Sequence, residues 1–380
     1  MKIVIAPDSF KGSLSAVEVS DAIEKGVRKA LPDVEIVKIP MADGGEGTVE
    51  ALVSSTQGHI EGTIVRDPLG YDVEAHYGIL GDGKTAVVEM ASASGLPLVP
   101  PEKRNPLYTT TYGTGELILA AVEKGCRKFI IGIGGSATTD CGTGMAQALG
   151  VVFYDKSGGK INTYMNGYWL GKTGSIDSSG LIPAIRKSSF TVACDVDNPL
   201  LGPKGSAHVY APQKGATPEI VEQLETNMAY FADILEKTID QKVRDIPGAG
   251  AAGGLGAGLI AFVNGTLKPG IEIVLEASRF VEKVQGASLI LTGEGKIDYQ
   301  TAFGKTLSGV AREAKKQAIP VIGIGGMVDA DIDNLYEIGI NSVFSLCNQP
   351  MDLQTAMENA DALLQVISER IIRAVLVNLI

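Results

Sequence analysis

The stretch Ser288–Lys305 carries more side chains able to bind or react than a plain connecting loop normally collects. It opens with the apolar run Leu289–Leu291, which predicts a short buried strand. Gly293 and Gly295 follow, so we expect the chain to turn as the strand ends. Ligands of open α/β sheets bind outside the carboxyl ends of strands, which favours a binding loop over a merely solvated one. The candidate binding residues of this loop are Thr292, Glu294, Asp298 and Gln300, with Lys296, Thr301 and Lys305 beside them.

Similar polar, glycine-rich loops follow other predicted strands. Glycines let backbone N–H groups approach an anion, and a lysine adds positive charge. The cations that we consider for a carboxylate or phosphate ligand are Lys11, Arg104, Lys204 and Lys305. The further candidate binding residues in these loops are Asp8, Ser9, Asp43, Gly44, Gly45, Glu46, Gly134, Gly135, Ser136, Asp140 and Asn198.

Two aspartates stand at the end of another predicted strand, Phe190–Cys194. Asp195 and Asp197 follow it directly, with Asn198 beside them. Carboxylates at such a place hold Mg²⁺ or accept a proton from a hydroxyl group. The alternative is ordinary turn chemistry, because Asp and Asn are common turn residues. Asp195 is therefore the candidate base or metal ligand, and Asp197 a second metal ligand.

Two segments match nucleotide-binding patterns without the context that such patterns need. Gly78–Thr85 fits the P-loop pattern, but Asp82-Gly83 and the β-branched residues after it predict a hairpin turn. Gly248–Gly253 fits the dinucleotide fingerprint, yet no convincing strand precedes it. Gly250, Gly253 and Gly254 either hold a phosphate at the start of a helix or allow tight helix packing, and the sequence leaves both open.

Composition excludes several classes of protein. The 380 residues include 45% hydrophobic and 20% charged residues, as in an ordinary α/β protein. The net charge of -11 and the absence of a basic block argue against a nucleic-acid binder. The four cysteines and three histidines are too widely separated to form a zinc-binding motif. The cysteines are therefore expected to be free thiols in a reducing compartment. No signal peptide or membrane-length apolar run stands in the sequence, so we expect a cytoplasmic protein.

The order of predicted elements indicates a parallel sheet built from both chain ends. Strands at Lys2–Ala6 and Val34–Ile39 alternate with helices, and alternation returns after Ile290, whereas the segment from about Ile60 to Met90 resembles a β-meander. The fold class is therefore α/β, with a Rossmann-like or flavodoxin-like parallel-sheet domain and a second, inserted α/β domain. We expect residues 1–60 and 286–380 to form the first and residues 61–285 the second, with the active cleft between them.

Seven motifs in order along the chain resemble the bacterial glycerate kinases that phosphorylate D-glycerate. They cover the chain from Met1 to about Gly326, and seven ordered motifs are far more specific than any one of them. The motifs are Met1–Gly12, Ala42–Thr48, Gly132–Thr138, Ala193–Pro199, Pro212–Ala216, Pro247–Gly254 and Thr292–Asp298.

The resemblance implies transfer of the γ-phosphoryl group of ATP to a glycerate hydroxyl, with Mg²⁺ as the metal and 2-phosphoglycerate favoured over 3-phosphoglycerate. Phosphoryl transfer depends mainly on positioning and charge neutralisation, which carboxylates, lysines and glycine-rich loops supply. On this hypothesis Asp195, Lys11 and Lys305 are the catalytic residues. Two alternatives stay open from the residues alone: an NAD(P)-dependent hydroxy-acid dehydrogenase and a non-catalytic hydroxy-acid sensor.

Overall fold

The computed structural model describes residues 1–377, which form two compact units. Unit 1 consists of Met1–Asp43, Glu50–Gln57 and the chain from Ile271 onward, and unit 2 of Gly44–Val49 and Gly58–Gly270. The sequence placed these boundaries after residues 60 and 285. Residues 271–285 therefore pack with the chain ends rather than with the middle of the chain.

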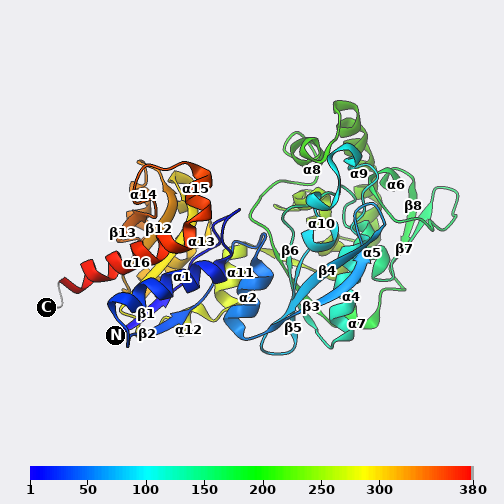
Figure 1. The fold of residues 1–380 in the computed structure, drawn as a ribbon. Helices are drawn as coiled ribbons and strands as arrows, with labels where there is room; N and C mark the ends of the chain where they lie inside the picture. Colours follow the sequence, from blue (N-terminus) through cyan, green and yellow to red (C-terminus); the bar gives the residue numbers. More distant parts are fainter. Residues whose placement is uncertain (378–380) are drawn as a thin grey trace. The chain divides into compact units, whose positions relative to one another are not determined.

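Unit 1 is a parallel five-stranded sheet in the order β13-β12-β11-β1-β2. Counted along the chain within this unit, the order is 2-1-3-4-5, that of flavodoxin-like folds. Both ends of the chain contribute strands, since Ile3 of β1 pairs in parallel with Leu289 of β11 (Figure 1). The elements are β1 (Lys2–Ile5), α1 (Ala16–Ala30), β2 (Glu35–Lys38), α2 (Thr48–Thr56), α11 (Gly270–Ala277), α12 (Phe280–Lys283), β11 (Leu289–Ile297), η4 (Tyr299–Ala302), α13 (Thr306–Lys316), β12 (Val321–Val328), α14 (Asp333–Ile338), β13 (Ser342–Ser345), α15 (Leu353–Glu358) and α16 (Ala360–Leu376).

Alternate residues of the central strands are buried on opposite faces of this sheet. Ile3 and Ile5 belong to a core shared with α1 and α16, whereas Val4 and Ile290 point the other way and are equally buried. Helices must therefore cover both faces, as in doubly wound sheets. Helix α1 lies beside α16 so closely that a Cβ at Gly26 would stand 2.2 Å from the Gln365 carbonyl oxygen (Figure 1).

The start of α1 follows from a local signal in the sequence. Ser15 is the N-cap: its hydroxyl accepts from the Glu18 amide, and the Glu18 carboxylate accepts from the Ser15 amide. This is the reciprocal capping box, which satisfies amide groups that a helix end otherwise leaves unpaired.

Two predicted element ends in unit 1 were wrong. β11 does not turn at Gly293 and Gly295 but continues to Ile297, because β12 pairs with it as far as Ile297↔Val328. Apolar residues at helical spacing predict one closing helix from Leu353 to Val377, but the structure has two helices there, α15 and α16, which are separated at Asn359.

Unit 2 has a mixed six-stranded sheet in the order β10-β9-β6-β5-β4-β3 and a separate hairpin of β7 and β8. The predicted meander is present: β3 and β4 are antiparallel, as are β4 and β5, and Asp82 caps the turn between the latter pair. The elements are β3 (His59–Arg66), β4 (Asp72–Ile79), β5 (Thr85–Glu89), α3 (Ala91–Ser94), η1 (Leu96–Leu98), η2 (Pro101–Lys103), α4 (Tyr112–Glu123), β6 (Lys128–Gly132), α5 (Thr143–Ala148), β7 (Val152–Asp155), α6 (Gly167–Leu170), β8 (Thr173–Asp177), α7 (Pro183–Arg186), β9 (Ser189–Ala193), α8 (Ser206–Tyr210), η3 (Pro212–Lys214), α9 (Pro218–Ile239), α10 (Ala251–Val263) and β10 (Thr266–Lys268).

The chain is α/β throughout, as its pattern of elements predicted. Among residues 1–377 no helix combines the length and the apolar character needed to cross a bilayer.

Candidate active site

The candidate active site of unit 1 lies where the strand order of its sheet reverses. The chain connects β1 to β2 on one side and β11 to β12 on the other, so the loops after β1 and β11 leave in opposite directions. Such a switch point is where doubly wound sheets bind ligands. The two loops are joined directly: the Asp8 amide donates to the Gly293 carbonyl at 2.8 Å, and the Thr292 hydroxyl donates to the Ala6 carbonyl at 2.8 Å.

Asp8 is a buried carboxylate held by donors on two sides. Its side chain is 6% exposed. One oxygen accepts from the Thr306 hydroxyl at 2.5 Å, at the start of α13, and the other from the Ser9 amide at 2.6 Å. Burial raises the pKa of Asp8, with Asp43 adding to the effect, although these hydrogen bonds and Lys11 oppose it. The carboxylate is thus fixed in place at an electrostatic cost.

Glu294 is the second buried carboxylate at the switch point. It stands on the continued part of β11 and is 8% exposed. The Thr301 hydroxyl donates to its Oε1 at 2.5 Å. Burial raises the pKa of Glu294 to about 7, and the negative charges of Asp8 and Asp298 add to this, against Thr301 and Lys305. A carboxyl group with a pKa near 7 inside a cavity is a typical mark of a functional site.

Lysines stand around this pair of carboxylates. Lys11 Nζ lies 3.4 Å from Asp43 Oδ2. Burial lowers the pKa of Lys11, but the carboxylates of Asp43, Asp8 and Glu294 outweigh it, so the pKa is raised overall and the lysine stays charged. Lys305, the residue before α13, keeps its side chain partly exposed with Nζ 3.8 Å from Asp298 Oδ1.

Asp298 organises the loop after β11. Its Oδ1 accepts from the Gln300 amide at 2.9 Å as the cap of η4, and its Oδ2 lies 3.0 Å from Lys296 Nζ. The hydrogen bond from Lys296 is the largest cause of its lowered pKa. A binding role for Asp298 and Gln300 stays a prediction, since these contacts shape the loop.

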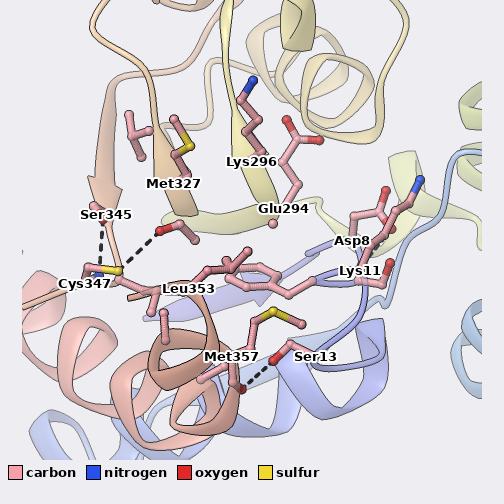
Figure 2. Close-up of a pocket in the computed structure, with 18 of the residues that line it drawn as sticks. Asp8, Lys11, Ser13, Glu294, Lys296, Met327, Ser345, Cys347, Leu353 and Met357 are labelled. Carbon is pink, nitrogen blue, oxygen red and sulfur yellow. Dashed lines mark hydrogen bonds between the residues drawn. The ribbon is translucent and has the colours of Figure 1, made fainter. Parts of the chain in front are cut away.

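One cavity of about 620 Å³ opens at these residues, and unit 1 supplies its whole lining. Asp8 and Lys11 lie on one side of it, with Glu294 above them in the view, and Met327, Cys347 and Leu353 on the other (Figure 2). The predicted residues Ser9, Asp43 and Lys305 also line it. The sequence therefore found the charged side of this cavity but missed its apolar side, which no motif marks.

The predicted metal ligands Asp195 and Asp197 lie in unit 2, after β9, and both are exposed. Asp195 Oδ1 accepts from the Gly270 amide at 2.9 Å. Asn198 holds its own loop: its amide donates to the Lys204 carbonyl at 2.7 Å, and its oxygen accepts from the Tyr210 hydroxyl at 2.6 Å. Among the described residues no group of three or more His, Cys, Asp or Glu forms a ready metal cage. The metal-binding role of the two aspartates stays a prediction.

The loop after β6 is held by Lys214 of η3, a residue that sequence reasoning did not select. Gly134 and Gly135 are exposed, and Ser136 accepts a hydrogen bond at 2.8 Å from Lys214 Nζ, which also donates to the Thr138 carbonyl at 2.6 Å. Lys214 is 2% exposed, and burial lowers its pKa to about 7. Only its position in the motif Pro212–Ala216 could have indicated it.

Asp140 is held in place by hydrogen bonds from its own unit. It is fully buried, and burial raises its pKa against the hydrogen bonds it accepts. The donors are the Thr111 amide and hydroxyl, both at 2.8 Å, and the amides of Gly142 and Gly144. Arg104 similarly donates to a backbone carbonyl, that of Val99. Neither contact tests the predicted binding roles.

Close packing explains why glycine occupies positions 250 and 253 of the segment that matches the dinucleotide fingerprint. A Cβ at Gly253 would stand 1.9 Å from the Thr138 carbonyl oxygen, and one at Gly250 would stand 2.1 Å from that of Pro199. The amides of Gly250 and Gly254 donate to backbone carbonyls, so they are not presented to an anion. Within residues 1–377 no strand leads directly into this segment, which removes the structural support for the dehydrogenase alternative.

The glycines after β2 also pack closely. Gly44 has a φ of +89°, and a Cβ there would stand 2.6 Å from that of Ala193. The Gly45 carbonyl accepts from the Thr48 hydroxyl at 2.8 Å, which turns the chain into α2. Glu46 is exposed beside them. The binding roles of these three residues stay predictions.

A flavodoxin-like sheet with a cavity, carboxylates and lysines at its switch point is the arrangement of an α/β ligand-binding unit. Comparison with known proteins specifies the family. The sequence profile of the Glycerate kinase family matches residues 3–376. The chain therefore belongs to the glycerate kinase family.

Individual relatives span nearly the whole chain. A glycerate kinase of Bacillus subtilis (strain 168) is 53% identical, covering 95% of this chain and 94% of the relative. A glycerate 2-kinase of Escherichia coli (strain K12) is 51% identical with the same coverage. A crystal structure from Salmonella typhimurium LT2, assigned to glycerate kinase 2, superposes with a TM-score of 0.91 at 46% identity, covering 100% of this chain and 99% of that one.

Proposed function

We propose that this protein is an ATP-dependent kinase that transfers the γ-phosphoryl group of ATP to D-glycerate and releases 2-phosphoglycerate and ADP. Membership of the glycerate kinase family supports the reaction, and the Escherichia coli glycerate 2-kinase supports the 2-phospho product. The observation in the structure that carries the proposal is the meeting of Asp8, Glu294, Lys11 and Lys305 at one cavity.

Lys11 and Lys305 are the groups that we assign to the phosphates of ATP. Phosphoryl transfer spreads negative charge over the equatorial oxygens, and cations that are already in place stabilise that charge. Lys11 keeps its charge, because the neighbouring carboxylates raise its pKa overall. Both lysines line the cavity. Lys11 lies in the loop after β1 and Lys305 directly precedes α13, so their backbones are anchored by the sheet and by a helix.

Asp8 and Glu294 fit a site for Mg²⁺ better than other described carboxylates of this unit. They are buried at one cavity. Burial is the main cause of the raised pKa of Glu294 and the charge of Asp8 adds to it, so a divalent cation beside them would relieve their repulsion. Mg²⁺ in kinases is usually held by one or two carboxylates together with phosphate oxygens. When bound, it would neutralise charge on the phosphates. The donors on Thr306 and Thr301 would keep the two carboxylates oriented.

Asp195 remains our candidate for the group that accepts the proton of the glycerate hydroxyl. It is exposed at the carboxyl end of β9, and the Gly270 amide orients its carboxylate. The exposed Gly134 and Gly135, with Ser136 fixed by Lys214, are our candidates for binding the glycerate carboxylate, since glycine-rich loops at strand ends suit anions.

An ADP-release assay with D-glycerate tests the reaction. We expect ADP to appear only when both ATP and glycerate are present. Coupling the product to enolase then tests the regiochemistry, because enolase accepts 2-phosphoglycerate directly. A signal that depends on added phosphoglycerate mutase would contradict the 2-phospho product, and the absence of ADP would contradict the kinase itself.

The remaining expectations about surroundings are also proposals. The four cysteines are all free thiols, which supports a reducing compartment such as the cytoplasm. The net charge of -11 supports small-molecule partners, glycerate and ATP, over nucleic acid.

A further inference from the structure

The cavity of unit 1 is larger and more apolar than glycerate requires. Its volume of about 620 Å³ lies within the range of 300–1,000 Å³ that holds drug-sized ligands. Glycerate is a three-carbon acid that is polar along its whole length. The cavity therefore has room for a larger ligand that carries an apolar part.

The side of the cavity away from Asp8 and Lys11 is mainly apolar, although Ser345 and Asp352 also line the cavity. Several of its side chains are exposed to the cavity or to solvent, with Leu353 76% and Met327 57% exposed. A group of neighbouring exposed apolar side chains is typical of a ligand-binding groove, whereas exposed apolar residues elsewhere on a surface are usually scattered singly. We call this side the apolar half; its residues are Met327, Val328, Leu346, Met351, Leu353 and Met357.

The apolar half is held in place before any ligand arrives. The Ser13 hydroxyl donates to the Met357 carbonyl at 2.7 Å, which ties α15 to the loop after β1 (Figure 2). Asp352 caps α15 by accepting from the Thr355 amide at 2.7 Å. Cys347 joins the ends of β12 and β13, with Sγ 3.6 Å from the Gly326 carbonyl oxygen. A pre-formed wall of this kind binds a ligand with little ordering cost.

The cavity thus offers cations and carboxylates at one end and an apolar wall at the other. A nucleoside triphosphate has the matching shape: a polyanion at one end and a flat, mainly apolar base at the other. Methionine side chains suit such a ring, since thioether sulfur makes favourable contacts with aromatic rings. Glycerate would leave the apolar half in contact with water.

We propose that the apolar half binds the base of ATP, with the triphosphate directed toward Lys11 and Lys305. This assignment rests on the proposed kinase function. It identifies the apolar half as the part of the cavity that distinguishes a nucleotide from a polyphosphate without a base. Unit 1 is then the nucleotide-binding unit.

The test compares ligands with and without the base on the full chain. Ala356 lines the cavity on α15 and is partly exposed, so Ala356→Trp fills the apolar half without entering the core. Leu353→Gln is a milder second variant that keeps size but removes apolar contact. Val281→Trp on α12, outside the cavity, is the matched control. Calorimetry with Mg²⁺ measures the Kd of ADP and of inorganic tripolyphosphate, and thermal melting checks folding.

We expect Ala356→Trp to weaken ADP binding about tenfold or more and Leu353→Gln severalfold, while tripolyphosphate binding changes less than twofold. In kinetics, the KM for ATP should rise in parallel, with the KM for glycerate and kcat near those of the wild type. The control should match the wild type in every measurement.

Normal ADP binding by both cavity variants would overturn the assignment, as would equal weakening of ADP and tripolyphosphate. A wild type that binds ADP no more tightly than tripolyphosphate would overturn it too. Failure of the kinase function is distinguishable: the wild type would then release no ADP with glycerate, while the effect of the variants on ADP binding would still decide where the base lies.

Discussion

Glu294 should limit the stability of the free protein and be required for activity. Its carboxylate is buried beside Asp8, and burial raises its pKa to about 7. Glu294→Gln has nearly the same shape as the protonated side chain, and its amide oxygen still accepts from Thr301. The variant therefore isolates the charge of Glu294 from its packing.

The pH dependence follows from the direction of this pKa shift. Because the folded pKa lies above the unfolded value of 4.5, the folded protein binds more protons between pH 4.5 and about 7. The stability due to protonated Glu294 is present below pH 4.5 and is lost as the pH rises through about 7. A tenfold change in proton affinity corresponds to about 1.4 kcal/mol, so the loss is at most about 3 kcal/mol.

Urea denaturation without nucleotide or Mg²⁺ measures this effect. We expect Glu294→Gln to be more stable than the wild type at pH 8, by up to about 3 kcal/mol, and to approach it at pH 4.5. Glu337→Gln, an exposed change on α14, is the control and should follow the wild-type profile. The kcat of Glu294→Gln should fall about 100-fold or more, since loss of even a supporting partner of a metal ligand typically costs 10–100-fold.

The reasoning would be refuted by a variant whose stability parallels that of the wild type at every pH. That result would mean that the carboxylate of Glu294 is well solvated in the folded state. Unchanged kcat together with the expected gain in stability would separate the two claims: the burial argument would hold, and the assignment of Glu294 to the Mg²⁺ site would be wrong.

Three further predictions test other parts of the molecule. Asp195→Asn should melt near the wild-type temperature and lose roughly 10²–10⁴-fold in kcat, the usual cost of a lost general base; wild-type kcat would move the assignment to Asp8 or Asp43. The stability of Lys214→Met should fall relative to that of the wild type as the pH rises from 7. Burial lowers the pKa of Lys214 in the folded state from 10.5 to about 7, so only the wild type gains stability between these pH values. Parallel urea profiles of the two proteins from pH 7 to 9.5 would contradict the burial argument. Gly26→Ala should destabilise unit 1 by roughly 1–3 kcal/mol in urea unfolding, because its Cβ would meet the Gln365 carbonyl of α16; an unchanged midpoint would show that the two helices separate easily.

Most elements of the fold could be predicted from the amino-acid sequence, because their signals are local. The apolar run at Lys2–Ile5 specifies β1, Ser15 and Glu18 specify the start of α1, and Asp82-Gly83 specifies the turn between β4 and β5. The carboxyl ends of strands also indicated the loops that we propose as ligand-binding sites. These features depend on residues within a few positions of one another, which a single sequence displays directly.

Element ends that depend on a distant partner could not be predicted in this way. Gly293 and Gly295 have the local character of a turn, yet β11 continues to Ile297 because β12 pairs along it. A Cβ at Gly293 would stand 2.4 Å from the Ile324 carbonyl oxygen, so close approach to a neighbouring strand, and not a turn, explains that glycine. Local residue preferences carry no information about such a neighbour.

The grouping of residues within the site emerged from the three-dimensional packing of the chain. Thr306 holds Asp8 across 298 positions of the chain, and Thr301 and Glu294 meet because the loop after β11 folds back. The raised pKa of Glu294 and the lowered pKa of Lys214 arise from burial, which the sequence does not state residue by residue. The apolar half has no motif, because it is assembled from side chains on β12, on α15 and in the loop between β13 and α15, which come together only in the folded chain.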